Sequence, residues 1–228
     1  MSAFSPLSRR SPIEAWIDQA AEGSQLRQGM LQPVALRSTT AQGSAVTMTE
    51  LSWHRRFGLK GPAAEAWLIA HGFAPAAPAN TWRRVNGALV GRLATSEFLV
   101  EAMDSSAHAA VAAAATELYA TVRPEGVYPV VRQDLVVRLH GPKLNELLRQ
   151  ICGVNFQPLL AQAASDQGSL LMTSMIGASV VAVPLWGGSA AELILWVDPS
   201  FAMYFWTTLL QVAAELGGGV LLDPTNEV

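Results

Sequence analysis

Two segments of this chain, LKGPAAEAWL (59–68) and RLHGPKLNELL (138–148), repeat one pattern about 80 residues apart. Each predicts the end of a strand, a Gly-Pro turn and a short amphipathic helix, because proline suits the first position of a helix. A second pair lies downstream, EFLVEAMDSSAHAAVAAAATELY (97–119) and ELILWVDPSFAMYFWTTLLQVAAEL (192–216). Each of these predicts an apolar strand, an Asp and a helix of about four turns. The chain is therefore expected to contain two similar halves.

The predicted order in each half is βαββα, since one further strand fits near residues 88–93 and near residues 170–185. The period is longer than that of solenoid repeats, about 20–50 residues. We expect an α+β fold in which the two duplicated halves form one compact unit. The predicted divisions are an N-terminal helix and extension (1–45), a first half (46–124) and a second half (125–228).

Connecting segments carry weaker signals. A helix is expected after Ser11-Pro12, followed by a loop at residues 23–29 and a β-type stretch near residues 34–37. Residues 72–87 contain two prolines and end in Asn-Gly, a pair typical of hairpin turns. This segment is predicted to be a long surface connection that ends in such a turn.

Several features favour a cytoplasmic protein without a membrane span. The apolar segment 170–186 is shorter than the about 20 residues that a spanning helix needs, and it contains Pro184. We expect two buried strands or one long bent strand there. The N-terminus has no apolar stretch of the signal-peptide type, and the single cysteine, Cys152, excludes an internal disulfide.

Charge is unevenly distributed along the chain. Only 14% of the residues are charged, against about 25% in a typical soluble protein. All 15 lysines and arginines lie in residues 1–149, whereas residues 150–228 contain six acidic residues and no basic one. A surface so poor in charge predicts that a partner covers part of the second half; alternatively, this half supplies most of the core of a compact monomer. No basic cluster exceeds an arginine pair, which argues against nucleic-acid binding.

The motifs of common active sites are absent from the sequence. It contains no glycine-rich dinucleotide or phosphate loop, no GxSxG, no HExxH and no CxxC. The four histidines have no metal-ligand spacing. We predict no catalytic residue and no metal site in this chain.

Tryptophan is common, with seven residues. Trp67 and Trp196 fall on apolar faces and are predicted to be core residues. Aromatic residues in or near loops often anchor a partner, and a helix that is apolar almost all round is either buried or pressed against another chain. The candidates for a partner interface are Trp16, Trp53, Trp82, Trp186 and Trp206.

The sequence resembles the gamma subunit of heterotetrameric sarcosine oxidase, from about Arg10 to Gly217. The resemblance lies in the opening RSPIEAW (10–16), the two strand-GP-helix units, the strand SEFLV (96–100) and the closing DPSFAMYFWTTLLQVAAELG (198–217). The family is related to the folate-binding domain of the glycine-cleavage T-protein. This chain departs from the family pattern at Phe98, where a Trp is usual, and in its long polar stretch 23–44.

The resemblance implies a non-catalytic subunit that packs on the folate-binding half of a larger alpha subunit, in a complex with beta and delta subunits. It implies that FAD, FMN, NAD, zinc and tetrahydrofolate belong to those partners and that this chain holds no cofactor. The complex would demethylate sarcosine or a related N-methyl amino acid oxidatively and pass the one-carbon unit to tetrahydrofolate.

The alternative is a stand-alone folate-binding or aminomethyl-transferring protein of the T-protein kind. Its ligand would lie in the opening between the duplicated halves, where a carboxylate would bind the pteridine ring. Three carboxylates with apolar neighbours are the candidates, Glu97, Glu101 and Glu192.

Overall fold

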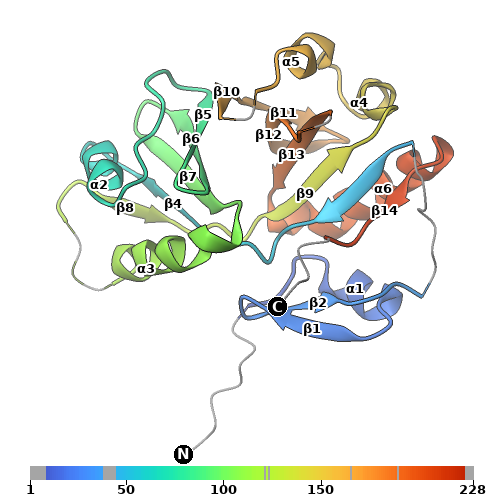
Figure 1. Cartoon of the computed structure of the whole chain (residues 1–228), viewed down its shortest axis with the longest axis horizontal. Coiled ribbons are helices and arrows are strands. Elements are labelled where there is room, and N and C mark those ends of the chain that lie inside the picture. Colours follow the sequence, from blue (N-terminus) through green and yellow to red (C-terminus); the bar gives the residue numbers. More distant parts are fainter. Residues whose placement is uncertain are drawn as a thin grey trace, which may run out of the picture.

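The computed structural model describes residues 9–37, 45–120, 122, 124–164, 166–188 and 190–223. In these residues two lobes, each with a six-stranded sheet, lie side by side above a smaller N-terminal layer (Figure 1). The first sheet has the order β10 (Gln167–Ser169), β5 (Thr81–Val85), β6 (Ala88–Ala94), β7 (Glu97–Ala102), β4 (Arg56–Lys60), β8 (Tyr128–Val130). The second has the order β11 (Leu171–Met175), β12 (Ala178–Trp186), β13 (Ala191–Val197), β9 (Leu135–His140), β3 (Thr47–Glu50), β14 (Gly219–Val220).

Helices cover the outer side of each sheet. The first lobe has α2 (Ala64–Ala70) and α3 (His108–Leu118), and the second has α4 (Leu144–Ile151), α5 (Gln157–Ala161) and α6 (Ala202–Glu215). Short 3-10 helices, η1 (Ser105–Ala107) and η2 (Pro199–Phe201), lead into α3 and α6. The N-terminal layer consists of α1 (Glu14–Ala20) and the hairpin of β1 (Ser24–Arg27) and β2 (Met30–Pro33).

Side-chain alternation along the strands divides the core into three clusters. On β7, Phe98 and Val100 pack against the helices of the first lobe, whereas Leu99 packs toward the other sheet. On β13, Leu195 packs on the helix side and Trp196 packs between the sheets. Each sheet is therefore buried on both faces, and the layers run helices, sheet, sheet, helices.

Three strands, β3, β8 and β10, are exchanged between the lobes; β10 pairs with β5 in the first sheet, although β9 and β11, its neighbours in the chain, lie in the second. β3 and β4 are consecutive in the chain, yet β3 pairs with β9 in the second sheet while β4 lies in the first. Likewise β8 pairs with β4 in the first sheet and the next strand, β9, lies in the second. The connections 51–55 and 131–134 therefore both cross from one lobe to the other. Each sheet therefore contains strands from both predicted halves, 46–124 and 125–228. The boundary between these halves stays a prediction.

Both predicted Gly-Pro turns are present. Gly61 and Gly141 have φ values of 124° and 129°, and α2 and α4 begin three residues after each. Backbone angles of this kind favour glycine. Space is also limiting, because a Cβ on Gly141 would lie 2.5 Å from the carbonyl oxygen of Ala45.

We therefore expect Gly141→Ala to lower the free energy of unfolding by at least about 1–3 kcal/mol, the cost of holding a non-glycine residue in a disfavoured backbone region. Gly153→Ala is the matched control, because no atom lies within 4 Å of its added Cβ. It should change the stability by less than about 0.5 kcal/mol. Chemical unfolding of both variants measures the difference, and equal stabilities would contradict this reading of the turn.

The mixed α+β class is confirmed, but the βαββα detail is not. Two strands were predicted between the helices of each half, whereas three, β5 to β7, follow α2 and four, β10 to β13, follow α5. Residues 170–186 do form two strands, β11 and β12, and Asn86-Gly87 is the turn between β5 and β6.

The N-terminal layer differs from its prediction. The expected loop at residues 23–29 contains strand β1, and the expected β-type stretch at 34–37 has only one isolated bridge, from Leu36 to Ala21. The helix is present as α1. Part of the polar stretch, residues 38–44, lies outside the described residues.

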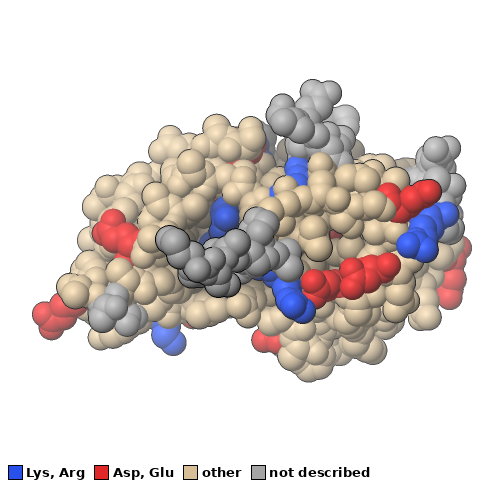
Figure 2. Space-filling model, turned by 90° about the horizontal axis from the view of Figure 1, so that it is seen from below, with Lys and Arg blue, Asp and Glu red and all other residues tan. Residues whose placement is uncertain are grey.

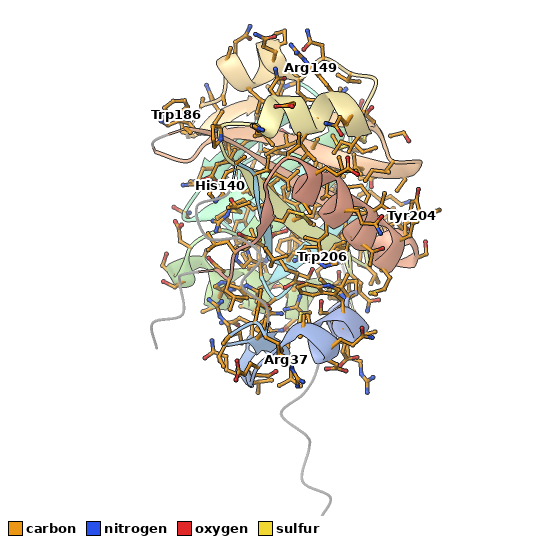
Figure 3. All side chains as sticks on the ribbon, turned by 90° about the vertical axis from the view of Figure 1, so that its right-hand side faces the viewer. Arg37, His140, Arg149, Trp186, Tyr204 and Trp206 are labelled. Carbon is orange, nitrogen blue, oxygen red and sulfur yellow. The ribbon has the colours of Figure 1, made fainter. Side chains whose placement is uncertain are left out.

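Charged side chains are sparse on the face that carries the N-terminal layer (Figure 2). Helix α6 lies across the outside of the second lobe, with Trp206 beneath it on the side of α1 and Tyr204 projecting away (Figure 3). Within the described part of the chain, none of the helices is long and apolar enough to cross a membrane.

Candidate functional site

A buried polar cluster lies where the two crossing connections meet between the sheets. We call His54, Arg56, Glu101 and Trp196 the central cluster. Glu101, on β7, has no exposed surface. Its Oε2 lies 3.1 Å from Nε of Arg56 and accepts a hydrogen bond from the Trp196 indole, while Oε1 lies 3.2 Å from Nδ1 of His54. The carboxylate is thus contacted by three side chains of its own chain.

The pKa of Glu101 reflects these contacts. Burial by itself raises the pKa of a carboxyl group, but the positive charge of Arg56 and the contacts with His54 and Trp196 outweigh it and lower the pKa of Glu101. The carboxylate is therefore ionised at neutral pH, and its charge balances that of the buried Arg56.

Arg56 also joins the two crossings through the backbone. Its guanidinium donates to the carbonyl of Asp134 at 2.7 Å and to that of Leu51 at 3.1 Å. In the same region the amide of Leu51 donates to the carbonyl of Val136 at 2.8 Å. The cluster therefore holds the two lobes together at the point of strand exchange.

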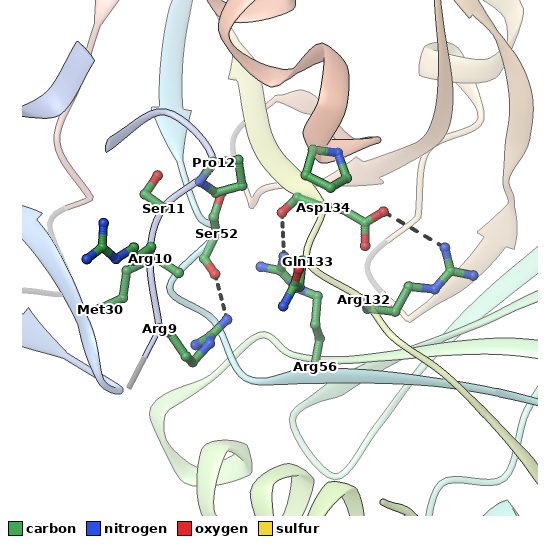
Figure 4. A pocket seen from close by; sticks show the side chains of 11 residues that line it. Arg9, Arg10, Ser11, Pro12, Met30, Ser52, Arg56, Arg132, Gln133 and Asp134 are labelled. Atoms are coloured by element: carbon green, nitrogen blue, oxygen red, sulfur yellow. Dashed lines mark hydrogen bonds and ion pairs between the residues drawn. The ribbon is translucent and has the colours of Figure 1, made fainter. Parts of the chain in front are cut away.

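A cavity of about 680 Å³ lies on one side of the cluster (Figure 4). Its wall contains four arginines, Arg9, Arg10, Arg56 and Arg132. Arg9 donates to three consecutive carbonyls, those of residues 52–54, at 2.8–3.0 Å. Burial, together with the charges of Arg56 and Arg55, lowers the pKa of Arg9 to about 10. Arg132 lies 3.2 Å from Glu97 and 3.9 Å from Asp134.

A second cavity, of about 730 Å³, lies beside Trp53, His54 and His108. The rings of Trp53 and His108 stack at 21° with centroids 5.2 Å apart, and the guanidinium of Arg27 lies 3.6 Å from the Trp53 ring centre. Burial and the neighbouring His54 lower the pKa of His108 to about 4, so its ring is neutral at pH 7. Its Nδ1 accepts a hydrogen bond from the amide of Arg55.

The central cluster and the arginines beside it resemble a structural ion-pair network more closely than a reactive centre. Arg9 and Arg56 donate to backbone carbonyls, Arg56 also pairs with Glu101, and Arg10 and Arg132 pair with carboxylates near them. In the parts of the chain that the structure describes, no group of His, Cys, Asp or Glu side chains has the arrangement of a metal site.

The structure does not bring the three candidate carboxylates together. Glu101 lies at the centre, Glu97 is partly exposed at the start of β7 and pairs with Arg132, and Glu192 is partly exposed at the start of β13. Between the sheets, the space near Glu101 is filled by buried side chains that include Trp82, Leu89, Leu99 and Trp196.

The five tryptophans proposed for a partner interface separate into two groups. Trp82 and Trp206 are fully buried in this chain and Trp53 is 6% exposed, so burial disfavours a partner contact for these three, which stays a prediction. Trp16 is half-buried and meets Trp206 edge-on at 5.0 Å between centroids. Trp186 is 44% exposed and stays a candidate.

Sequence reasoning missed most of the central cluster. It found no ligand spacing among the four histidines, of which His54 is one, and no basic cluster larger than an arginine pair such as Arg55-Arg56, and it predicted Trp196 only as a core residue. Glu101 carried the available signal, because a carboxylate that follows three apolar residues on a predicted strand needs partners when it is buried.

The known proteins that this chain is similar to were found by structure. No protein-family model matches the sequence, and no curated protein matches it either. An aminomethyltransferase T of the glycine cleavage system from Bartonella henselae superposes with a TM-score of 0.66 at 12% identity, over 94% of this chain. This chain spans 59% of the length of that protein.

A heterotetrameric sarcosine oxidase from Corynebacterium sp. U-96, solved in complex with pyrrole 2-carboxylate, contains a chain that superposes with a TM-score of 0.61 at 20% identity. The match covers 93% of this chain and 98% of that one. The chain therefore has the fold that these two proteins share, in agreement with the resemblance seen in the sequence.

Proposed function

We propose that this chain is a non-catalytic gamma subunit of a heterotetrameric, sarcosine oxidase-like enzyme of the cytoplasm. In this proposal it packs on the folate-binding part of a large alpha subunit, and the complex also contains beta and delta subunits. FAD, FMN, NAD, zinc and tetrahydrofolate are held by the partners. The complex oxidatively demethylates sarcosine or a related N-methyl amino acid.

The observation that carries the proposal is the complete burial of the Glu101 carboxylate. Glu101 is the candidate best placed for chemistry or ligand binding, yet it contacts Arg56, His54 and Trp196 and has no exposed surface. A carboxylate that is enclosed by side chains of its own chain and balances a buried arginine is not accessible to a substrate, and removing it would leave that arginine unpaired. Its role supports a structural subunit.

Two further observations support the same proposal. The superposition with a chain of a heterotetrameric sarcosine oxidase runs over nearly the whole of both chains. The second lobe combines a charge-poor sequence with large exposed apolar side chains, among them Trp186, Phe201 and Tyr204. Surfaces of this kind are typical of protein interfaces.

Co-expression with the alpha, beta and delta subunits tests the proposal. We expect the chain to co-purify with them at a fixed ratio and to raise the melting temperature of the complex, because it buries surface of its partners. Omitting it should lower the stability of the complex while each remaining flavin keeps its absorption spectrum. A chain that elutes alone as a monomer from every such co-expression would contradict the proposal.

The stand-alone folate-binding alternative rests on the superposition with the aminomethyltransferase. The filled space between the sheets and the separation of Glu97 and Glu192 from Glu101 make it the weaker candidate. Calorimetric titration of the purified chain with tetrahydrofolate distinguishes the two. We expect no heat of binding, whereas saturable heat would favour the alternative.

A further inference from the structure

We propose that the outer face of η2 and α6 is the surface through which this chain docks on its protein partner. This face, called the α6 face below, consists of Phe201, Met203, Tyr204, Thr207 and Gln211. The partner surface that fits it is apolar at its centre and carries lysine or arginine at its rim. The inference rests on the proposed function, for which it supplies the contact surface.

The α6 face exposes large apolar side chains. Phe201, Met203 and Tyr204 have 46%, 36% and 52% of their surface exposed. The opposite side of α6 is buried in the core of the second lobe through Phe205, Trp206 and Leu209. Tyr204 projects away from the lobe while Trp206 lies beneath the helix (Figure 3). The helix is thus apolar on two sides, of which only one is covered within the chain.

The corresponding helix of the first lobe shows that the fold does not need these residues. Asp104 directly precedes η1 and Asp198 directly precedes η2, and a helix follows each 3-10 turn at the same distance. In this alignment Met203 and Tyr204 correspond to Ala109 and Ala110 of α3, which are also exposed. Small residues suffice at these positions in one lobe, so the large ones in the other point to a function beyond folding.

The charges at the ends of the α6 face indicate the chemistry of the partner. Exposed Asp198 lies at its N-terminal end and exposed Glu215 at its C-terminal end. No lysine or arginine occurs anywhere in residues 150–228. An apolar stripe with acidic ends is complementary to an apolar patch with a basic rim, since opposite potentials across an interface fix its register.

The same charges argue against a second copy of this chain as the occupant. In a two-fold dimer the same patch meets itself. Asp198 and Glu215 of one copy would then face acidic residues of the other, and residues 150–228, which include the whole α6 face, supply no basic residue to compensate. A different, larger protein chain is therefore the occupant that fits.

Arginine substitutions on matched positions test the inference. The complex with the alpha, beta and delta subunits is reconstituted with Met203→Arg or Tyr204→Arg, and with Ala109→Arg or Ala110→Arg as controls at the corresponding positions of α3. All four sites are exposed, so the thermal melting of the isolated chain should stay unchanged. We expect the two α6 variants to bind their partners at least tenfold more weakly and the two α3 variants to bind like the wild type.

A second pair of variants tests the charge argument. Glu215→Lys should weaken binding several-fold at low salt and less at high salt, because ions screen exposed charges. Glu146→Lys, on the exposed side of α4, is its control and should have no effect.

The possible outcomes separate the two proposals. If the wild type binds its partners and Met203→Arg and Tyr204→Arg bind equally well, the α6 face is not the docking surface. The proposed function would be unaffected by that result. Loss of binding by the α3 controls as well would also overturn the α6 face as the docking surface, since the effect would then not be specific to α6. Failure of the wild type to bind would remove both proposals. A wild-type chain that sediments as a dimer and becomes monomeric with Tyr204→Arg would show that a second copy is the occupant, against the inference.

Discussion

Replacing Glu101 with glutamine is expected to lower the free energy of unfolding by about 3–5 kcal/mol, the typical cost of removing one partner from a buried ion pair. The variant keeps the shape of the side chain but leaves the guanidinium of Arg56, whose side chain is 1% exposed, without its compensating charge. It also replaces an acceptor of the Trp196 indole hydrogen bond with a neutral group. Urea unfolding of the purified chain at pH 7 measures the loss.

Glu97→Gln is the matched control on the same strand. Glu97 pairs with Arg132 at 3.2 Å, but its side chain is 36% exposed, so solvent screens the pair and the loss should stay below about 1 kcal/mol. If Glu101→Gln and Glu97→Gln lowered the free energy of unfolding equally, burial of the Glu101–Arg56 pair would have no special energetic role.

The pH dependence of stability gives a second readout for the same variant. The contacts with Arg56, His54 and Trp196 lower the pKa of Glu101 in the folded chain below its ordinary value of 4.5. Its contribution is then complete above about pH 4.5 and is lost as the pH falls through the folded-state value. Glu101→Gln lacks this carboxyl, so its stability should fall less steeply with acid than that of the wild type.

Trp206→Ala is expected to lower the free energy of unfolding by about 3–5 kcal/mol, the usual range for removing a buried tryptophan. Trp206 has no exposed surface and packs between α6 and α1, edge-on to Trp16 at 5.0 Å. Truncation would leave a cavity and loosen the attachment of the N-terminal layer. Calorimetric melting of the isolated chain, without any partner, measures the effect.

Trp186→Ala provides the comparison, because 44% of the Trp186 side chain is exposed. Its effect on the isolated chain should be below about 1 kcal/mol, as for most exposed positions. If Trp206→Ala were equally mild, Trp206 would have to be stabilised by a partner rather than by the core, contrary to its position in the structure.

Local signals account for what could be predicted of the fold. The Gly-Pro turns were predictable because proline and glycine restrict the backbone at the residue where they stand. The final helix and strands β11 and β12 carry their apolar pattern within one segment. β5 was missed since it is only five residues long and follows a connection rich in proline. β1 is four residues long and partly exposed, and its pattern is too short to indicate a strand.

The candidate site was predictable only in part. Glu101 could be identified from its apolar neighbours on β7. Its partners could not, because Trp196 lies 95 residues away, His54 lies on a connection that crosses between lobes and Arg56 begins the strand that follows it. No sequence spacing relates residues that meet through strand exchange.

The sequence by itself determined the mixed class of the fold, its two Gly-Pro units and the low charge of its second half, since each of these is set by residues near one another in the chain. Only the tertiary structure decided that β3, β8 and β10 change lobes and that Trp82 and Trp206 lie inside while Tyr204 lies outside. Periodicity shows which side chains share a face of an element. Which other element covers that face depends on contacts between residues far apart in the chain.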